Sequence, residues 1–316
     1  MLKRHELLPY GEIVECAFWA ILVGSFVLNT MALATFSKLS FMPTLSHYFL
    51  VSMVFNDWLR SVLVQTVAVY MNHTNFGKMS SWYCQYFAFT STFFGLNSII
   101  HLTALAVEKY KTIVNPLANR RHKKEAKIII PCLWAFSLAW SVCPLIGWSS
   151  YSNVPGHYVG CSISWYSSNA SDKVYVFSLF AVFFFVPLST TMYCYVKIYF
   201  VLKTLTNKDI KRWGSESLAA KETIKAKVRS TKMAFAMITG FIFAWTPYTI
   251  VSLCAAFGYQ VHPLVVTCSA IFAKTSTIYN PVILIFLHTN FRKTLLRCMK
   301  RLQCKKYLTN EEPINV

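Results

Sequence analysis

The sequence predicts an all-α membrane protein, a bundle of seven transmembrane helices followed by a short amphipathic helix on the cytoplasmic side. Of its 316 residues, 55% are hydrophobic and only 14% are charged, a composition too apolar for a soluble domain of this length. Seven apolar runs each approach or exceed the roughly 20 residues that an α-helix needs to cross a bilayer. They lie at about 16–36, 41–71, 79–107, 128–154, 174–196, 233–261 and 262–291, and only Asp57 and Arg60 interrupt the second.

The distribution of basic residues sets the orientation of these helices. Lysine and arginine cluster after the third run, between the fifth and sixth runs, and in the C-terminal tail. Cytoplasmic loops carry this excess, so we expect the N-terminus outside and the C-terminus inside. The formal net charge of +19 then reflects topology and attraction to anionic lipid of the inner leaflet. A nucleic-acid partner is not expected, because no soluble module presents the charge.

Three regions follow from this topology: an extracellular N-terminus at 1–14, a transmembrane domain at 15–289, and an amphipathic helix with a cytoplasmic tail at 290–316. The N-terminus lacks a cleavable signal pattern, so the first helix is expected to direct insertion into the plasma membrane. Asn72 and Asn169 begin Asn-x-Ser/Thr sequons. Both fall in outside loops, where glycans are added.

The cysteines divide by location. Cys84 and Cys161 both lie on the oxidising outer side, which predicts a disulfide that ties a long loop across the mouth of the bundle. Cys298 and Cys304 lie in the amphipathic segment, where basic residues alternate with leucine and methionine. These two thiols are palmitoylation candidates, and unmodified surface cysteines are the alternative. No metal site is expected.

Lys274 is the only charged residue in the seventh apolar run. A lysine at mid-bilayer costs at least about 2.5–3.5 kcal/mol, which makes it a functional-site hypothesis. The alternatives are an amine that extends to the interface or pairs with a buried carboxylate. Extension fits poorly, because long uncharged stretches separate Lys274 from both ends of the run. A desolvated amine is readily deprotonated, and a neutral amine can condense with an aldehyde to form a Schiff base.

Other polar groups inside the predicted helices need partners, because an unsatisfied polar group in lipid is costly. Asn29, Asp57 and the Asn280-Pro281 pair are expected to form a buried network bridged by water. Proline also interrupts the fifth and sixth helices, at Pro187 and Pro247. These positions are possible hinges.

Taken together, these residues resemble the rhodopsin-like G-protein-coupled receptors. The resemblance extends over residues 15–304, and lysine in the segment Phe272-Ala273-Lys274-Thr275-Ser276 with Tyr279-Asn280-Pro281 narrows it to the animal opsins. The motifs that carry it are Asn29, Asp57, the Cys84 and Cys161 pair, Glu108-Lys109-Tyr110, Trp134, Pro187, Tyr195, the run from Phe241 to Tyr248, and Asn280-Pro281.

The resemblance implies a light-sensing receptor, not an enzyme, that binds 11-cis-retinal as a Schiff base on Lys274. Isomerisation to the all-trans form then displaces Trp245 and moves the sixth helix outward, which opens a cleft for a heterotrimeric G protein. Flat aromatic walls suit a polyene. The residues expected to line its pocket are Phe87, Thr92, Gly95, Phe241, Trp245, Tyr248 and Ala273.

One departure from the family concerns the charge near Lys274. A protonated Schiff base in a low-dielectric pocket needs a counter-anion. Relatives supply a carboxylate on the third helix or in the second outside loop, but Phe87 occupies the first position and the loop Val154-Pro155-Gly156-His157 has no acid. Either the Schiff base is unprotonated and absorbs ultraviolet light, or chloride held by Arg60, Ser91 or Thr92 serves as counterion. Arg60 is also expected to pair with Asp57.

Further departures lie on the cytoplasmic side, where the resemblance assigns G-protein coupling to Glu108, Lys109, Tyr110, Tyr195, Asn280 and Pro281. Lys109 replaces the usual arginine, so the contacts around Glu108 must be rearranged. Leu284 stands where the Asn-Pro motif usually ends in tyrosine, which removes the usual partner of Tyr195. Thr309 is the only serine or threonine beyond the amphipathic helix, so arrestin is a possible partner but capture by multisite phosphorylation is not expected.

Three alternatives remain open. A retinal photoisomerase-type opsin would keep Lys274 with weak or no signalling, and light-dependent G-protein activation distinguishes it from a receptor. A light-driven ion pump would need carboxylates beside the Schiff base. A chemosensory receptor would be indicated if Lys274 did not bind retinal.

Overall fold

The computed structural model describes residues 8–39, 44–73, 81–114, 122–154, 160–212 and 218–309, with side chains in all of these except 8–10, 122, 205–212, 218–224 and 301–309. Nearly all of this part is helical. The helical segments are α1 Leu8–Phe36, α2 Leu45–Arg60, π-helical η2 Ser61–Gln65, α3 Thr66–His73, α4 Ser81–Val114, α5 His122–Val142, 3-10 turn η3 Cys143–Leu145, α6 Ala170–Phe180, π-helical η4 Ala181–Phe185, α7 Val186–Arg212, α8 Leu218–Ala256, α9 Pro263–Lys274, α10 Ser276–Leu287 and α11 Thr289–Thr309.

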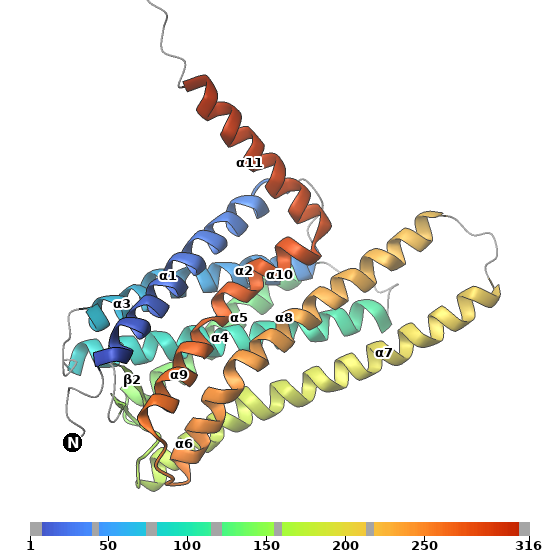
Figure 1. Cartoon of the computed structure of the whole chain (residues 1–316). Coiled ribbons are helices and arrows are strands. Elements are labelled where there is room, and N and C mark those ends of the chain that lie inside the picture. Colours follow the sequence, from blue (N-terminus) through green and yellow to red (C-terminus); the bar gives the residue numbers. More distant parts are fainter. Residues whose placement is uncertain are drawn as a thin grey trace, which may run out of the picture.

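These segments form the predicted seven-helix bundle with a C-terminal helix (Figure 1). Among the described residues, six helices are long and apolar enough to cross a membrane. The stretch from Leu45 to His73 is not one of them, and it buries the polar side chains Asn56, Asp57, Arg60 and Gln65. The protein is therefore a multi-pass membrane protein whose second span is its most polar one.

The predicted end of the fourth span was wrong. The fourth apolar run extends to residue 154, but its helix ends at Leu145. Gly147 and Ser149 there have φ angles of 100° and 75°, a left-handed backbone that cannot continue a right-handed helix. The first helix begins at Leu8, upstream of the first apolar run, which starts at about residue 16.

The chain after α5 forms a small hairpin over one end of the bundle. Strands β1, Tyr151–Asn153, and β2, Cys161–Ile163, pair antiparallel, with Ser152 opposite Ser162. The predicted disulfide is confirmed: Cys84 in the first turn of α4 is bonded to Cys161 at the start of β2. This end lies opposite the end from which α11 leaves the bundle (Figure 1).

Direct hydrogen bonds join the helices at most of the buried polar positions. Asn280 on α10 donates to Asp57 on α2 at 2.7 Å, whereas Asn29 on α1 donates to the carbonyl of Thr277 at 3.0 Å. Two direct contacts thus tie together the polar side chains expected to form a network, and water bridges between them stay a prediction. Gln65 donates to the Thr277 hydroxyl at 3.0 Å, which places a third helix at the same point of the seventh span.

Two π-helical turns alter the direction of side chains within spans. η4 ends at Phe185, two residues before Pro187, whose missing N–H removes a helical hydrogen bond. η2 follows Arg60 directly. A π-helical turn contains one extra residue, which rotates the helix face that follows it. Such turns are frequent at functional sites.

Candidate functional site

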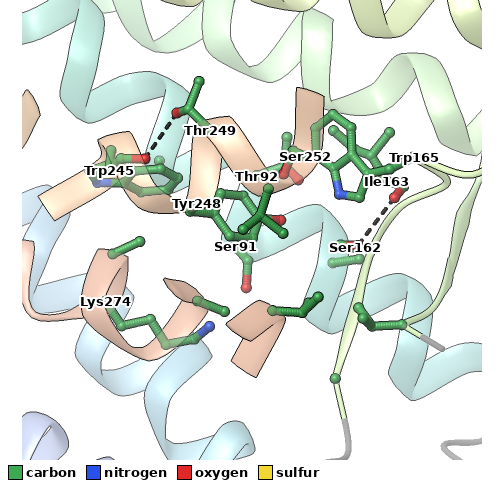
Figure 2. Close-up of a pocket in the computed structure, with 18 of the residues that line it drawn as sticks. Ser91, Thr92, Ser162, Ile163, Trp165, Trp245, Tyr248, Thr249, Ser252 and Lys274 are labelled. Carbon is green, nitrogen blue, oxygen red and sulfur yellow. Dashed lines mark hydrogen bonds between the residues drawn. The ribbon is translucent and has the colours of Figure 1, made fainter. Parts of the chain in front are cut away.

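A cavity of about 220 Å³ lies between α4, α8, α9 and the β2 hairpin strand. Figure 2 shows Lys274 and Ser91 directing their polar ends into it from opposite helices. Every residue that the sequence predicts for a ligand pocket or an anion site lines this cavity. These are Arg60, Phe87, Ser91, Thr92, Gly95, Phe241, Trp245, Tyr248, Ala273 and Lys274.

Lys274 is the last residue of α9, where the seventh span breaks. The Thr275 N–H bonds back to the carbonyls of Ile271 and Phe272 at 3.3 and 3.1 Å. The Thr277 hydroxyl satisfies the carbonyl of Lys274 itself at 3.0 Å. The Lys274 amine lies 5.7 Å from the ring centroid of Phe87 and 5.8 Å from that of Phe18. The amine therefore stands among aromatic rings.

Arg60 enters the cavity from α2, and its predicted ion pair with Asp57 is wrong. Asp57 instead accepts the hydrogen bond from Asn280, and no ion pair joins Asp57 and Arg60, both of which the structure describes. The Arg60 guanidinium lies over Trp245, with its central carbon 5.3 Å from the ring centroid. Its Nε and Nη1 are buried and have no hydrogen-bond partner.

Ser91 adds a third unpartnered donor to the cavity. Its Oγ is buried and forms no hydrogen bond within the structure. Buried polar groups are rarely left in this state, because each costs about 1–3 kcal/mol. Arg60 and Ser91 both line the cavity, so together they offer N–H and O–H donors to something that the protein chain does not itself supply.

The described lining of the cavity supplies no counter-charge. Among the described residues that line it, Arg60 and Lys274 are the charged ones, and none is Asp or Glu. The neighbouring segment 155–159 also contains no acidic residue. The described residues hold no group of His, Cys, Asp and Glu suited to a metal ion. The electrostatics of the pocket thus favour an anion or a neutral amine.

Trp245 forms the floor of the cavity and is tightly held. Its indole N–H donates to Ser276 Oγ at 3.1 Å, next to the break at Lys274. A Cβ placed on Gly95 would stand 2.9 Å from the indole ring, so only glycine permits this approach. Phe241 stacks on the indole at 5.4 Å, and Tyr248 meets it edge-on at 6.0 Å.

Several aromatic lining residues were not predicted. Trp165 follows β2, and its ring lies 6.3 Å from that of Tyr248. Phe180 and Phe183 come from the end of α6 and from η4, and Phe18 comes from α1. The phenylalanine-rich run at 180–185 was a usable signal. The position of Trp165 could not be predicted, because it depends on the β1–β2 hairpin. The apolar run that extends to residue 154 predicted helix where that hairpin begins.

A second polar cluster lies at the other end of the bundle. The Lys109 amine on α4 donates to Ser46 Oγ on α2 and to Ser230 Oγ on α8, both at 2.7 Å. Ser46 donates to the Glu108 carboxylate, and the Thr112 hydroxyl donates to the same group at 2.8 Å. Lys109 and Glu108 are 3.7 Å apart. Lys109 thus joins α4 to α8 through a hydroxyl group.

Two of the remaining coupling residues, Tyr110 and Tyr195, make aromatic contacts. Tyr195 on α7 packs against Phe235 at 5.0 Å, and its buried hydroxyl has no partner. Tyr110 lies 5.9 Å from Tyr193. His288 accepts a hydrogen bond from the Phe291 N–H at 3.1 Å.

The structure shows where most of the predicted modification sites lie, and their modification stays a prediction. Asn169 is exposed and caps α6, and Asn72 lies one residue before the end of α3. Cys298 on α11 is a half-buried free thiol, and the side chain of Cys304 lies outside the described residues.

Comparison with known proteins relates the chain to one large family. Residues 28–284 match the family model described as 7 transmembrane receptor (rhodopsin family). Opsin-3 of Mus musculus is 31% identical over 300 residues, which cover 92% of this chain and 73% of that protein. Opsin-VA of Rutilus rutilus is 31% identical over 272 residues, which cover 85% and 68%. Melanopsin of Podarcis siculus is 30% identical over 295 residues, which cover 90% of this chain.

The chain spans 60% of the length of that melanopsin and 47% to 56% of three other melanopsins. In fold, it is similar to the crystal structure of squid rhodopsin, with a TM-score of 0.82 and 22% sequence identity. That likeness covers 93% of this chain and 86% of the squid chain.

Proposed function

Because the chain belongs to the rhodopsin family of seven-transmembrane receptors and, within it, to the animal opsins, we propose that it is a light-sensing receptor that carries retinal on Lys274. The isomer proposed for the dark state is 11-cis, and the product of illumination is all-trans. Members of this family are receptors rather than enzymes. The proposed location is the plasma membrane, with the N-terminus outside.

The observation that carries this proposal is the Lys274 amine, placed among aromatic rings in an apolar cavity whose described lining has no carboxylate. The amine and the aldehyde of retinal would form a carbon–nitrogen double bond and release water. Phe87, Trp245 and Tyr248 would hold the polyene between flat faces, and Gly95 keeps Trp245 close. When bound, retinal supplies absorption of light and a change of shape.

The residues of the chain offer a route from this pocket to the cytoplasmic side. Trp245 lies two residues before Pro247 on α8, and a proline inside a helix is a natural bending point. Outward bending of α8 would break the Lys109–Ser230 hydrogen bond at its cytoplasmic half. The opened face would bind a heterotrimeric G protein, with the basic cytoplasmic segments and anionic lipid beside it. Arrestin remains a possible further partner.

Replacement of Lys109 with methionine tests this route. We expect the dark rate of G-protein nucleotide exchange to rise about tenfold or more, because the variant loses the hydrogen bond from Lys109 to Ser230 on α8, and a hydrogen bond from a charged group contributes about 1.5–3 kcal/mol. Lys111→Met is the matched control, since Lys111 is exposed on the same helix. Equal dark rates in wild type and Lys109→Met would show that this amine does not restrain α8.

We also propose chloride as the counterion of a protonated Schiff base on Lys274. Arg60 Nε, Arg60 Nη1 and Ser91 Oγ are buried without partners, and Thr92 lines the same cavity. An anion there would satisfy these donors and balance two positive charges that otherwise repel each other in a medium of low dielectric. Without the anion, the pocket favours an unprotonated Schiff base and ultraviolet absorption.

Exchange of the anion tests this part of the proposal. We expect the purified, retinal-bound protein in chloride to absorb in the visible, and the band to shift when nitrate or gluconate replaces chloride. The double change Arg60→Met with Ser91→Ala should remove that sensitivity. A visible band that stays in place in every anion would exclude chloride, and an ultraviolet band indifferent to anions would indicate the unprotonated form.

Light-dependent nucleotide exchange tests the receptor function itself. Membranes that contain the wild-type protein and 11-cis-retinal should accelerate nucleotide exchange on a G protein after illumination and not in the dark. A panel of Gα classes is needed, since the sequence does not identify the class. A protein that isomerises retinal in light but activates no member of the panel would be a photoisomerase-type opsin instead.

A further inference from the structure

We propose that Arg60 is a positioning residue that holds Trp245 in the resting receptor through a cation–π contact. The inference rests on the proposed function, because it assigns Trp245 a movement during activation. It concerns the chain's own side chains, so it can be tested without retinal.

The contact has the geometry that a strong cation–π interaction requires. The guanidinium carbon is 5.3 Å from the centroid of the Trp245 ring, and tryptophan is the best aromatic partner for a cation. Arg60 is only 3% exposed, so little water screens the attraction. Such contacts are strongest when they are desolvated.

Asp57, three residues earlier on α2, attracts the Arg60 charge but forms no ion pair with it. Its carboxylate accepts a hydrogen bond from Asn280 instead. Arg60 Nε and Nη1 form no hydrogen bond. A guanidinium can lie over a ring and still donate from its edge, so the contact with Trp245 and the proposed anion site use different parts of one side chain. Among the described groups, the ring of Trp245 thus makes the close contact with the face of the guanidinium.

The surroundings of Trp245 define the resting position of its ring. Arg60, the last residue of α2, contacts the ring from one side. Trp245 is meanwhile fixed at its edges by Gly95 and Ser276. Rotation of the indole out of this position must separate it from Arg60. The contact therefore favours the resting state over any state in which Trp245 has moved.

The first test compares dark nucleotide exchange by retinal-free protein. We expect Arg60→Met to raise the rate about 5-fold to 30-fold, the change that corresponds to loss of one desolvated cation–π contact. Arg60→Lys, which keeps the charge, should retain most of the restraint. Gln65→Met is the control, because Gln65 is a buried polar residue on the same span that bonds to Thr277 and not to Trp245. A rate for Arg60→Met equal to that of wild type would overturn the proposal.

The second test leaves Arg60 in place and reduces the negative charge on the face of the Trp245 ring. Fluorinated tryptophans at position 245 reduce the negative charge of the ring face with little change in size, so the dark rate should rise stepwise with each added fluorine. In Arg60→Met the same series should have no effect. The proposal is contradicted if the dark rate does not change with added fluorine in the protein that keeps Arg60. It is also contradicted if the dark rate rises equally with added fluorine in Arg60→Met. Retinal binding by these proteins is scored separately by absorption, so failure of the opsin assignment would not be mistaken for failure of this contact.

Discussion

Lys274→Ala abolishes the absorption band that the wild-type protein acquires with 11-cis-retinal. The expected loss is complete, because the variant lacks the amine that would form the covalent bond, and the remaining aromatic contacts can hold retinal only as a free aldehyde. The measurement is the spectrum of detergent-purified protein after removal of unbound retinal.

The control for this variant is Lys173→Ala, which removes an exposed lysine outside the cavity. It should bind retinal as wild type does. The Lys274→Ala protein should keep its thermal midpoint or gain slightly, because it no longer buries a cation in the membrane. A covalent pigment that survives in Lys274→Ala would show that another amine carries the retinal.

The double change Cys84→Ser with Cys161→Ser is expected to have the second largest effect. The disulfide closes a loop with a sequence separation of 77, and its loss should destabilise the fold by roughly 4 kcal/mol through the entropy of the unfolded chain. We expect a markedly lower midpoint of thermal unfolding and a low yield of folded protein. Cys132→Ser, which changes an exposed free cysteine, should behave as wild type.

Loss of the disulfide should also open the pocket. Cys161, Ser162 and Ile163 on β2 line the cavity, and the bond to Cys84 holds that strand over it. Folded protein that lacks the disulfide should therefore release retinal faster than wild type in the dark. Retention at the wild-type rate would mean that the hairpin closes the cavity without help from the bond.

Much of this arrangement could be predicted from the sequence, since a bilayer leaves few choices. Apolar runs long enough to span it must be helical, and basic residues mark the cytoplasmic ends. Lys274 was identifiable as a candidate functional residue because a lone cation in such a run is costly. The disulfide followed from two cysteines on the outer side.

The partners of Arg60 could not be predicted, because they depend on contacts between segments far apart in the sequence. Spacing along a regular helix places Arg60 one turn from Asp57 and predicts an ion pair. In the structure, Asp57 instead accepts a hydrogen bond from Asn280, over two hundred residues away in the sequence, and Arg60 contacts the ring of Trp245. No local pattern announces the π-helical turn or the long-range pairing.

The polar cluster around Lys109 was predicted only in outline. Lys109 in place of the usual arginine indicated that the contacts of Glu108 must differ. The partners of Lys109 could not be identified, because they are uncharged serine hydroxyl groups. Ser46 and Ser230 are ordinary helix residues until the bundle brings them within 2.7 Å of the Lys109 amine. The hairpin was hidden in the same way, within a run that looked like continuous helix.

The most direct test of the central claim is to locate the retinal chemically. Borohydride reduction of the purified, retinal-bound wild-type protein converts a Schiff base to a stable amine, and proteolysis followed by mass spectrometry identifies the modified peptide. Our account predicts a single retinyl group on the peptide that contains Lys274. Retinyl on any other lysine, or none after full reduction of a protein that still absorbs, would contradict it.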